Sequence, residues 1–188
     1  VFNKISGIPE SRVIGSGTIL DTARLRSRIS EYLSISQKNV HAFVLGEHGD
    51  SSFVPWSSAR ISNVPLEQFK DCVSDKDFTQ AELNYEDIEN YMRTSGGKII
   101  QRKGATFYAI AMSVCHLCEC IIDNANAVIA VSTMMHGEYG IDNCCLSIPT
   151  VVNASGSVTK VLPEMTEEEV EKLRHSAQCL KEVIDQID

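Results

Sequence analysis

Apolar residues recur at helical spacing in several stretches of the chain, and these stretches are its predicted helices. The first covers residues 18–33, where Thr18 stands in the position of an N-cap. Helical spacing also covers residues 78–103, and Gly104 should end that helix. Inside it, the Gly96-Gly97 pair is expected to cost stability or to mark a bend. The apolar stripe of the first helix consists of Leu25, Ile29 and Leu33.

Two more helices are predicted in the second half of the chain. One spans residues 106–123, and the other follows Thr166 and Glu169, which have the spacing of a capping box. Both carry a periodic apolar face that we expect to be buried. The expected buried residues are Phe107, Ile110, Ala111, Val114, Leu117 and Ile121 in the former helix, and Val170, Leu173, Ala177, Leu180, Ile184 and Ile187 in the latter.

Short apolar runs at residues 40–45, 127–131 and 148–152 predict strands. Turns are expected at residues 138–140 and 155–157, where glycine stands among polar residues. Helices and strands do not alternate regularly along the chain. We therefore predict an α+β fold, with antiparallel strands packed against long helices, rather than a doubly wound parallel sheet.

Composition and charge narrow the class of protein. The chain has 188 residues, enough for one domain, and its content of 43% hydrophobic and 22% charged residues is ordinary for a globular protein. The net charge of −8 argues against nucleic acid or an anionic membrane as the main partner, but a small anionic substrate needs only one or two local cations. No apolar run is long enough to span a bilayer. Seven cysteines, an odd number, fit reduced thiols in a cytoplasmic protein better than a disulfide framework.

A histidine in a glycine-rich loop is the first candidate for chemistry. His48 lies within Gly46-Glu47-His48-Gly49-Asp50, where two glycines allow a tight turn and leave the imidazole uncrowded. Beside two acidic residues, an imidazole can titrate near neutral pH and act as a general acid or base. The alternative is an ordinary histidine of a surface loop, which an isolated histidine would favour.

Asp21 and Arg24 are the second candidate. They are three residues apart on the first predicted helix, so they share a face. The planar fork of Arg24 suits a bidentate contact with a carboxylate. Asp21 could hold an imidazole in one tautomer, as the acidic member of a catalytic triad does. The alternative is a solvated ion pair of little energetic value.

Five strings together resemble bacterial L-lactate dehydrogenases of the lactate/malate dehydrogenase family. They stand in the order and separation typical of that family, and the resemblance covers almost the whole chain, from Ser6-Gly7 to the final helix. It implies that residues 1–188 form the C-terminal, substrate-binding and catalytic domain of such an enzyme. The strings are GSGTILDTARLR (residues 15–26), GEHGDS (46–51), RKGATFY (102–108), GEYGI (137–141) and IPTVVN (148–153).

The resemblance also implies roles for individual residues. His48 takes the hydroxyl proton of lactate as hydride leaves for NAD, and it returns the proton when pyruvate is reduced. Asp21 holds the tautomer of His48 and stabilises its cation, while Arg24 pairs with the substrate carboxylate. Thr106 lies beside the small side group of the substrate, and Ile110 packs near the nicotinamide. Such a reaction needs a base tuned near neutral pH and fixed geometry toward the cofactor.

A regulatory site is a separate hypothesis. Arg26 is two residues beyond Arg24 and should point away from the active site. His41 lies on the predicted strand that leads to His48. Both match positions that bind fructose 1,6-bisphosphate across a subunit interface in the bacterial enzymes that this sugar phosphate activates. The alternative is that Arg26 is solvated and His41 is an unremarkable strand residue.

The chain lacks a dinucleotide-binding fingerprint. Gly15-Ser16-Gly17 begins like one, but Leu20 stands where the third glycine should be and no clear strand precedes it. We therefore expect that the N-terminal Rossmann domain is absent and that the isolated chain is inactive. In the complete enzyme the resemblance implies a cytoplasmic homotetramer.

Three further readings compete with a lactate dehydrogenase. A lactate-like malate dehydrogenase shares the same catalytic residues, although Thr106 after Lys103-Gly104-Ala105 favours lactate. A catalytically inert domain with only an assembly role is the alternative from another class. A zinc module at residues 115–120 is disfavoured, and no metal site is predicted, because cysteines in the middle of an apolar helix act as small hydrophobic residues.

Overall fold

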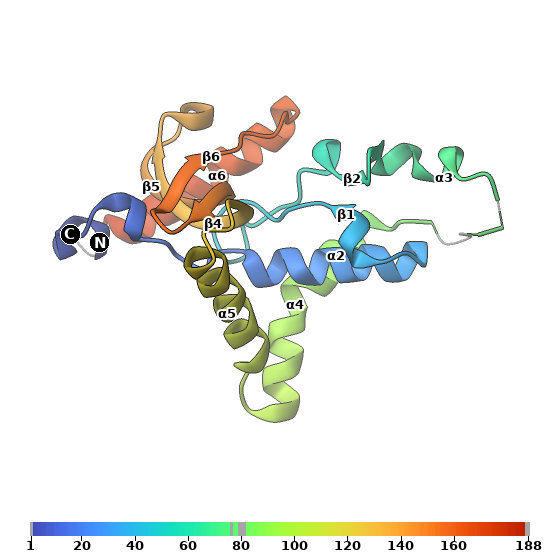
Figure 1. Cartoon of the computed structure of the whole chain (residues 1–188), viewed down its shortest axis with the longest axis horizontal. Helices are drawn as coiled ribbons and strands as arrows, with labels where there is room; N and C mark the ends of the chain where they lie inside the picture. Colours follow the sequence, from blue (N-terminus) through green and yellow to red (C-terminus); the bar gives the residue numbers. More distant parts are fainter. Residues whose placement is uncertain (1, 76, 79–81, 187–188) are drawn as a thin grey trace.

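The computed structural model describes residues 2–75, 77–78 and 82–186 of the protein. In this part of the chain, two three-stranded antiparallel sheets combine with helices that are mostly longer than the strands (Figure 1). Short 3-10 turns connect several of these elements. The helices are α1 (Phe2–Ser6), α2 (Ile19–Leu33), α3 (Phe69–Cys72), α4 (Tyr85–Lys103), α5 (Tyr108–Ile122) and α6 (Glu167–Ile184), and the strands are β1 (Val40–His41), β2 (Arg60–Ile61), β3 (Val64–Pro65), β4 (Ala127–His136), β5 (Asp142–Asn153) and β6 (Gly156–Lys160).

The larger sheet has the order β4-β5-β6, and both of its pairings are antiparallel. Ala127 pairs with Val152, and the register continues as far as Met134, after which an irregularity shifts it. The strands extend beyond the apolar runs that predicted them, because backbone pairing continues through polar residues. The predicted α+β class with antiparallel strands is thus confirmed.

The smaller sheet is much shorter than the sequence predicted. Only Val40 and His41 of the expected strand at residues 40–45 pair, with the neighbouring strand β2. Beyond them the chain makes isolated bridges instead, from Leu45 to Phe53 and from Gly46 to Ser147. An apolar run in the sequence indicates that its side chains are buried, but it does not indicate which backbone groups form hydrogen bonds with another strand.

Two helix boundaries differ from the prediction. Thr18 occupies the N-cap position of α2, but its hydroxyl donates to the carbonyl of Val44 instead of capping the helix. The helix α4 begins at Tyr85, not near residue 78, because the Asn84 side chain accepts a hydrogen bond from the backbone of Asp87 and caps it there. Residues 79–81 of the predicted stretch lie outside the described part.

The other end and the middle of α4 are informative as well. Gly104 ends the helix in a left-handed conformation, with φ of 77°, as predicted. The Gly96-Gly97 pair does not interrupt the helix, which continues to Lys103. The predicted capping box of α6 is present in full, between Thr166 and Glu169. Ile187, the last residue of the predicted stripe of α6, lies outside the described part.

The buried face of α5 was predicted only in part: Leu117 is buried and Ile121 packs against the same cluster, as predicted. The helix buries Ser113, Leu117 and Cys120, whereas Phe107 and Val114 are exposed. The helix packs against α2, β4 and β5. Periodicity alone could not select this face, because the helix is apolar nearly all round.

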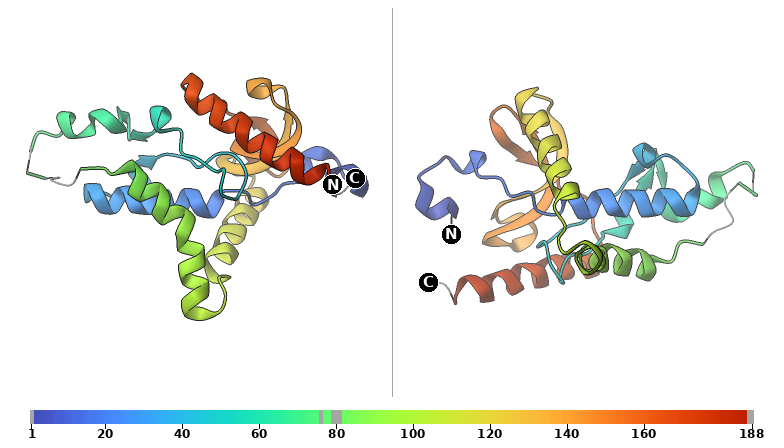
Figure 2. Two further views of the ribbon diagram at one scale, coloured as in Figure 1. Left: turned by 180° about the vertical axis from the view of Figure 1, so that it is seen from behind. Right: turned by 90° about the horizontal axis from the view of Figure 1, so that it is seen from below.

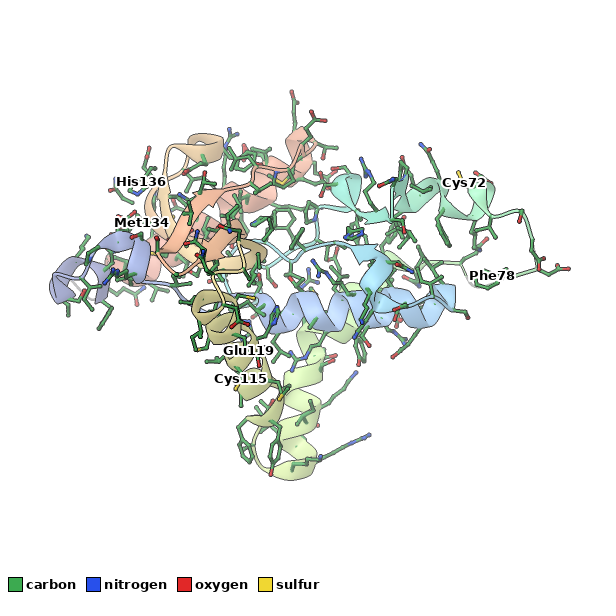
Figure 3. All side chains as sticks on the ribbon, viewed as in Figure 1. Cys72, Phe78, Cys115, Glu119, Met134 and His136 are labelled. Carbon is green, nitrogen blue, oxygen red and sulfur yellow. The ribbon has the colours of Figure 1, made fainter. Side chains whose placement is uncertain are left out.

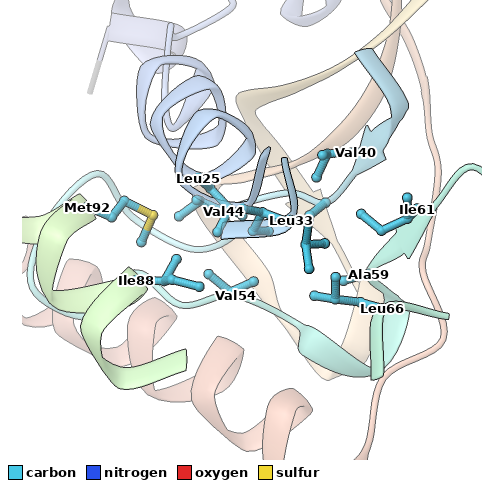
Figure 4. Packing of buried hydrophobic residues seen from close by; sticks show 12 residues of the cluster. Leu25, Leu33, Val40, Val44, Val54, Ala59, Ile61, Leu66, Ile88 and Met92 are labelled. Atoms are coloured by element: carbon cyan, nitrogen blue, oxygen red, sulfur yellow. The ribbon is translucent and has the colours of Figure 1, made fainter. Parts of the chain in front are cut away.

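Buried side chains form three clusters, and α2 contributes to two of them. Figure 4 shows the largest, in which α2 packs against α4 and the short sheet. A second lies between the larger sheet and α6, and a third joins α2, α5 and β4. The stripe predicted for the first helix, Leu25, Ile29 and Leu33, is in the largest cluster and is almost fully buried. The helix α2 is therefore fixed on several sides, which makes it a rigid support for side chains on its remaining face.

The helices α4 and α5 form an arm that projects from the rest of the molecule and turns back after Gly104 (Figures 1 and 2). The base of this arm meets α2. In all three ribbon views, α1 and the C-terminal end of α6 lie at the same end of the molecule. None of the helices in the described part is long and apolar enough to cross a membrane.

Candidate active site

A cavity of about 380 Å³ opens between α2, the loop after residue 45 and the projecting arm. It brings together all five residues that the resemblance assigned to substrate, proton and cofactor. They come from three separate parts of the chain. The five are Asp21 and Arg24 on α2, His48 in the loop, Thr106 between α4 and α5, and Ile110 on α5.

Hydrogen bonds hold the segment that leads to His48 against α2. The hydroxyl of Thr18 donates to the carbonyl of Val44 at 2.5 Å, and the amide of Val44 donates to Thr22 Oγ1 at 3.0 Å. Both threonines and Val44 are buried. Both the amide and the carbonyl of Val44 are therefore bonded to α2, the helix that carries Asp21.

The loop itself is fixed by Ser176 of α6, which is fully buried. The backbone amide of Glu47 donates to Ser176 Oγ at 2.8 Å, and Ser51 Oγ contacts both Ser176 Oγ and a carboxylate oxygen of Glu47. Gly46 has φ of +94°, and a Cβ there would lie 2.6 Å from Ser176 Oγ. Glycine is therefore required at Gly46, and its absence of a side chain lets the loop approach α6.

The central contacts of the site are made by Asp21. Its Oδ2 lies 2.6 Å from Nδ1 of His48, and its Oδ1 accepts a hydrogen bond of 3.2 Å from Nη1 of Arg24. The side chain of Asp21 is only 9% exposed, whereas that of His48 is 63% exposed. The carboxylate is thus buried under its partners, and the imidazole faces the cavity. Because Nδ1 is engaged, Nε2 is the nitrogen available to a bound molecule.

Asp21 raises the pKa of His48 above its ordinary value of 6.5 through this hydrogen bond, while partial burial opposes the shift. The negative charges of Asp21 and Glu47 add to the rise, and the positive charge of Arg24 lowers it. The protonated imidazole is the form favoured by the pair. The site therefore holds a proton at His48 more firmly than a free imidazole would, and can give it to a bound acceptor.

Several residues that line the cavity were not singled out for this site from the sequence. They include Arg93, which donates to Glu89 at 2.7 Å and to the carbonyl of Ser52 at 3.3 Å. Met92 and Gly96-Gly97 of α4 line the same wall. Their contribution depends on how α4 crosses α2, which no local pattern indicated.

The Gly15-Ser16-Gly17 string has a structural role. Gly15 pairs with Ser132 of β4, and a Cβ at Gly17 would lie 2.3 Å from Ser147 Oγ. The same Ser147 hydroxyl accepts a hydrogen bond from the amide of Thr18. The two glycines thus let the chain pass close to the larger sheet before α2 begins.

Arg26 lies apart from the active-site cavity, in a second cavity of about 420 Å³. Its Nε donates to the carbonyl of Ala42 at 3.0 Å, its guanidinium stacks on Phe43, and burial lowers its pKa. His41, next to Ala42, is exposed on β1. Lys38 also lines this cavity, so it offers two cations.

The cysteine-rich segment lies on α5, where Figure 3 labels Cys115 and Glu119. Cys115 and Cys118 are exposed, and Cys120 is buried with its sulfur 3.8 Å from Nε2 of His116. Within the described residues, no group of three or more histidine, cysteine or acidic side chains is arranged to hold a metal ion.

The fold and the site together define a class of domain. In this class a histidine held by a carboxylate, here His48 on Asp21, and an arginine, here Arg24, line one cavity. The chain matches the family model for the lactate/malate dehydrogenase, alpha/beta C-terminal domain, over residues 18–188. It therefore belongs to the lactate/malate dehydrogenase family, which confirms the resemblance inferred from the five strings.

Similar proteins agree with this assignment. The L-lactate dehydrogenase of Acetivibrio thermocellus is 39% identical over 189 residues, which covers 100% of this chain and 58% of the relative. That of Shouchella clausii is 45% identical over 177 residues, which covers 94% of this chain and 53% of the relative. A crystal structure of a lactate dehydrogenase from a deep-sea metagenome library is 39% identical and superimposes with a TM-score of 0.88 over 97% of this chain and 57% of that one. The minor L-lactate dehydrogenase of Enterococcus mundtii is 33% identical and gives a TM-score of 0.90 over 99% and 58%. The chain thus spans somewhat more than half the length of these relatives.

Proposed function

We propose that this chain is the substrate-binding and catalytic half of an NAD-dependent L-lactate dehydrogenase, an oxidoreductase that interconverts pyruvate and L-lactate in fermentation. The observation that supports it most is the meeting of His48, Asp21 and Arg24 at one cavity. The two ion pairs of Asp21 fix the positions of the His48 imidazolium and the Arg24 guanidinium relative to each other. A small 2-oxo acid can then contact His48 through its carbonyl oxygen and Arg24 through its carboxylate.

In this proposal His48 is the acid and base. During pyruvate reduction its Nε2 donates a proton to the carbonyl oxygen, and Asp21 holds the proton on Nδ1 and stabilises the cation before transfer. In the reverse direction the neutral imidazole accepts the hydroxyl proton. General acid–base catalysis of this kind contributes about 10²- to 10⁴-fold to a rate.

Arg24 binds and orients the carboxylate, because its guanidinium fork matches two carboxylate oxygens. In this proposal Thr106 contacts the substrate side group and Ile110 packs against the nicotinamide; the support is that both residues line the cavity. When bound, NAD supplies the hydride acceptor for lactate oxidation. The five residues determine where the reacting carbon stands relative to that ring.

A hybrid enzyme tests the proposal. It joins this chain, at Val1, to the part of the Acetivibrio thermocellus relative that precedes the matched region. We expect the hybrid to oxidise NADH with pyruvate, while the 188-residue chain alone, which contains no G-x-G-x-x-G fingerprint, should show no turnover. A folded hybrid that binds NADH and reduces no 2-oxo acid would contradict the proposal.

The same assay separates lactate from malate. All the relatives described above are named lactate dehydrogenases. We expect kcat/KM to be higher for pyruvate than for oxaloacetate. A preference for oxaloacetate would assign the chain to a malate dehydrogenase instead.

We further propose that Arg26 and His41 bind fructose 1,6-bisphosphate as an activator in a cytoplasmic homotetramer. The support is that Arg26 donates a hydrogen bond to the carbonyl of Ala42, the residue after His41, and that Lys38 adds a second cation to the cavity that Arg26 lines. The effector should lower the apparent KM for pyruvate, and an Arg26→Gln/His41→Gln double variant should lose the response. No response in the parent hybrid would contradict this part of the proposal.

A further inference from the structure

Three sulfur-containing side chains follow one face of α5, and the proposed function gives none of them a role. Met112, Cys115 and Cys118 stand at intervals of three residues along the helix. Met112 is 70% exposed, and both cysteines are exposed free thiols. The cysteines of this segment were expected to pack as small hydrophobic residues, but only Cys120 does so. The other two thiols are therefore open to a ligand.

Helix geometry gathers these three sulfurs, the sulfur trio, on one side of α5. Each step of three residues turns the chain by about 300° and advances it by about 4.5 Å, so successive members are neighbours on the helix surface. Cys115 is the middle member, with Met112 about one turn before it and Cys118 about one turn after it. Leu117 and Cys120 lie on the other, buried side. The sulfur trio thus shares the face of α5 that the chain leaves uncovered.

The spacing of Cys115 and Cys118 decides between a disulfide and a bound ion. Side chains three residues apart on a helix have Cβ atoms about 5–6 Å apart. A disulfide needs Cβ atoms about 3.5–4.5 Å apart, so oxidation of the pair would distort α5. An ion between the two sulfurs adds two metal–sulfur bonds, each of about 2.3 Å in zinc sites, and spans the wider gap with the helix intact.

The donor atoms select the kind of ion. Thiolate and thioether sulfurs are soft ligands, which favour Cu(I) over hard cations. Structural zinc takes four ligands, and among the described residues no group of three histidine, cysteine or acidic side chains is arranged to hold a metal ion. His116 is directed toward Cys120, with 3.8 Å between its Nε2 and the sulfur. The sulfur trio instead offers two thiolates and one thioether, a set suited to a monovalent ion of low coordination number.

The charge of α5 also favours a cation. Glu119 stands four residues after Cys115 and is exposed on the same side of the helix (Figure 3). The helix contains no lysine or arginine. A cation that approaches the sulfur trio is therefore attracted by the nearest charge on its own helix.

We propose that Met112, Cys115 and Cys118 form a binding site for one Cu(I) ion. Two copper–sulfur bonds replace the two S–H bonds of the cysteines, and the thioether of Met112 donates the third bond. Two protons pass to solvent for each ion, copper stays monovalent, and the loaded site carries one negative charge. The inference is independent of the proposed function, because none of these residues lines the active-site cavity.

The test titrates the reduced 188-residue chain with Cu(I), in the absence of oxygen, against the coloured Cu(I) chelator bicinchoninate. We expect one ion per chain to leave the chelator, with release of two protons. Cys115→Ser and Cys118→Ser should each lower the affinity by more than about 100-fold, because even an outer-shell partner of a metal is worth about 10- to 100-fold. Cys72→Ser is the matched control, since it removes an exposed thiol from another helix, α3, and should leave the affinity unchanged.

X-ray absorption at the copper edge tests the third ligand. We expect three sulfur neighbours in the parent chain and two in Met112→Leu, which keeps an apolar side chain of similar size. Circular dichroism of the variants checks that the exposed substitutions leave the helices intact.

Three results would overturn the inference. One is a chain that takes no Cu(I) from the chelator. Another is an affinity that falls with Cys72→Ser and not with Cys115→Ser, since the ion would then be bound elsewhere. The last is a spectrum with two sulfur neighbours in both the parent and Met112→Leu, which would mean that the thioether is not a ligand.

Discussion

Asp21 makes two different contacts with its two carboxylate oxygens, and the site depends on both. Oδ2 meets His48 and Oδ1 meets Arg24. Because the carboxylate is largely buried, it has little water to replace either partner. Truncation of a buried, charge-bonded group costs more than the net value of its hydrogen bond, since the partner loses its solvation as well.

The first expected outcome concerns the charge of Asp21. Asp21→Asn removes the largest cause of the raised pKa of His48, so this pKa should fall. In the hybrid, the rate of pyruvate reduction should then decline at a lower pH than in the parent, because the protonated imidazole is lost earlier. NMR titration of His48 in the chain measures the shift directly. Asp123→Asn, which removes one negative charge at the end of α5, is the control.

The same pair links folding to pH. Because the pKa of His48 is raised in the folded state, its contribution to stability is fully present below the unfolded value, near 6.5. It is lost as pH rises through the folded value. Asp21→Asn should therefore destabilise the chain more at pH 5.5 than at pH 9, which urea unfolding at the two pH values can measure. Equal destabilisation at both would mean that the ion pair is unimportant for folding.

Arg24 gives a second expectation at this scale. Lysine keeps the charge but loses the planar fork, so Arg24→Lys should bind the substrate carboxylate through fewer hydrogen bonds. A hydrogen bond to a charged group is worth about 1.5–3 kcal/mol. We expect a loss of about 10- to 100-fold in kcat/KM for pyruvate in the hybrid. Arg102→Lys, an exposed change at the end of α4, should have no effect.

At the scale of elements, the active-site loop is only as rigid as its attachment to α6. Ser176→Ala removes the acceptor of the Glu47 amide and a partner of Ser51. An unsatisfied buried donor costs about 1–3 kcal/mol, which should appear as a lower free energy of unfolding. The pKa of His48 should also return toward 6.5, as the loop holds the imidazole less firmly on Asp21. Gln178→Ala, on the exposed face of α6, should leave both quantities unchanged.

The N-terminus of α6 offers a local test of the fold. Thr166→Ala removes the side-chain oxygen that caps the amide of Glu169, and it should cost about 1 kcal/mol of stability. Thr166→Ser keeps that oxygen and should retain most of the stability. If the two variants unfold at the same urea concentration, the capping box contributes nothing measurable.

The elements that the sequence predicted best are those that local chemistry defines. Thr166 and Glu169 specify the start of α6, and the stripe of Leu25, Ile29 and Leu33 specifies the buried face of α2. The buried face of α5 was predicted only in part, because its apolar residues surround the helix and only packing against α2, β4 and β5 selects the buried ones. Pairing partners of a strand such as β1 are set by distant residues, which no local pattern contains.

The same distinction applies to the site. Asp21 and Arg24 could be placed on one face from their spacing, and the structure brings His48 to them. The means by which it does so, Thr18 and Thr22 on Val44 and Ser176 on the loop, join residues far apart in the chain. Helical periodicity does not predict such hydrogen bonds, because it describes only residues close together in the chain. The five residues that the family resemblance indicates all line the cavity.

At the scale of the whole molecule, the chain presents apolar side chains that its own fold does not cover. On α5, Tyr108, Met112 and Ile122 are at least 70% exposed, and on α1 Phe2 and Ile5 are exposed as well. Such surfaces are typical of protein–protein or interdomain contacts. They agree with the proposed enzyme, in which this domain meets a nucleotide-binding half and further subunits.

The most direct test of the central claim is the rate of NADH oxidation with pyruvate by the hybrid and its His48→Asn variant. Asparagine keeps a polar group near the position of Nδ1, toward Asp21, but cannot carry the proton. We expect the variant to lose at least about 100-fold in kcat while it still binds NADH. A variant that turns over as fast as the parent would show that His48 is not the acid and base of this site.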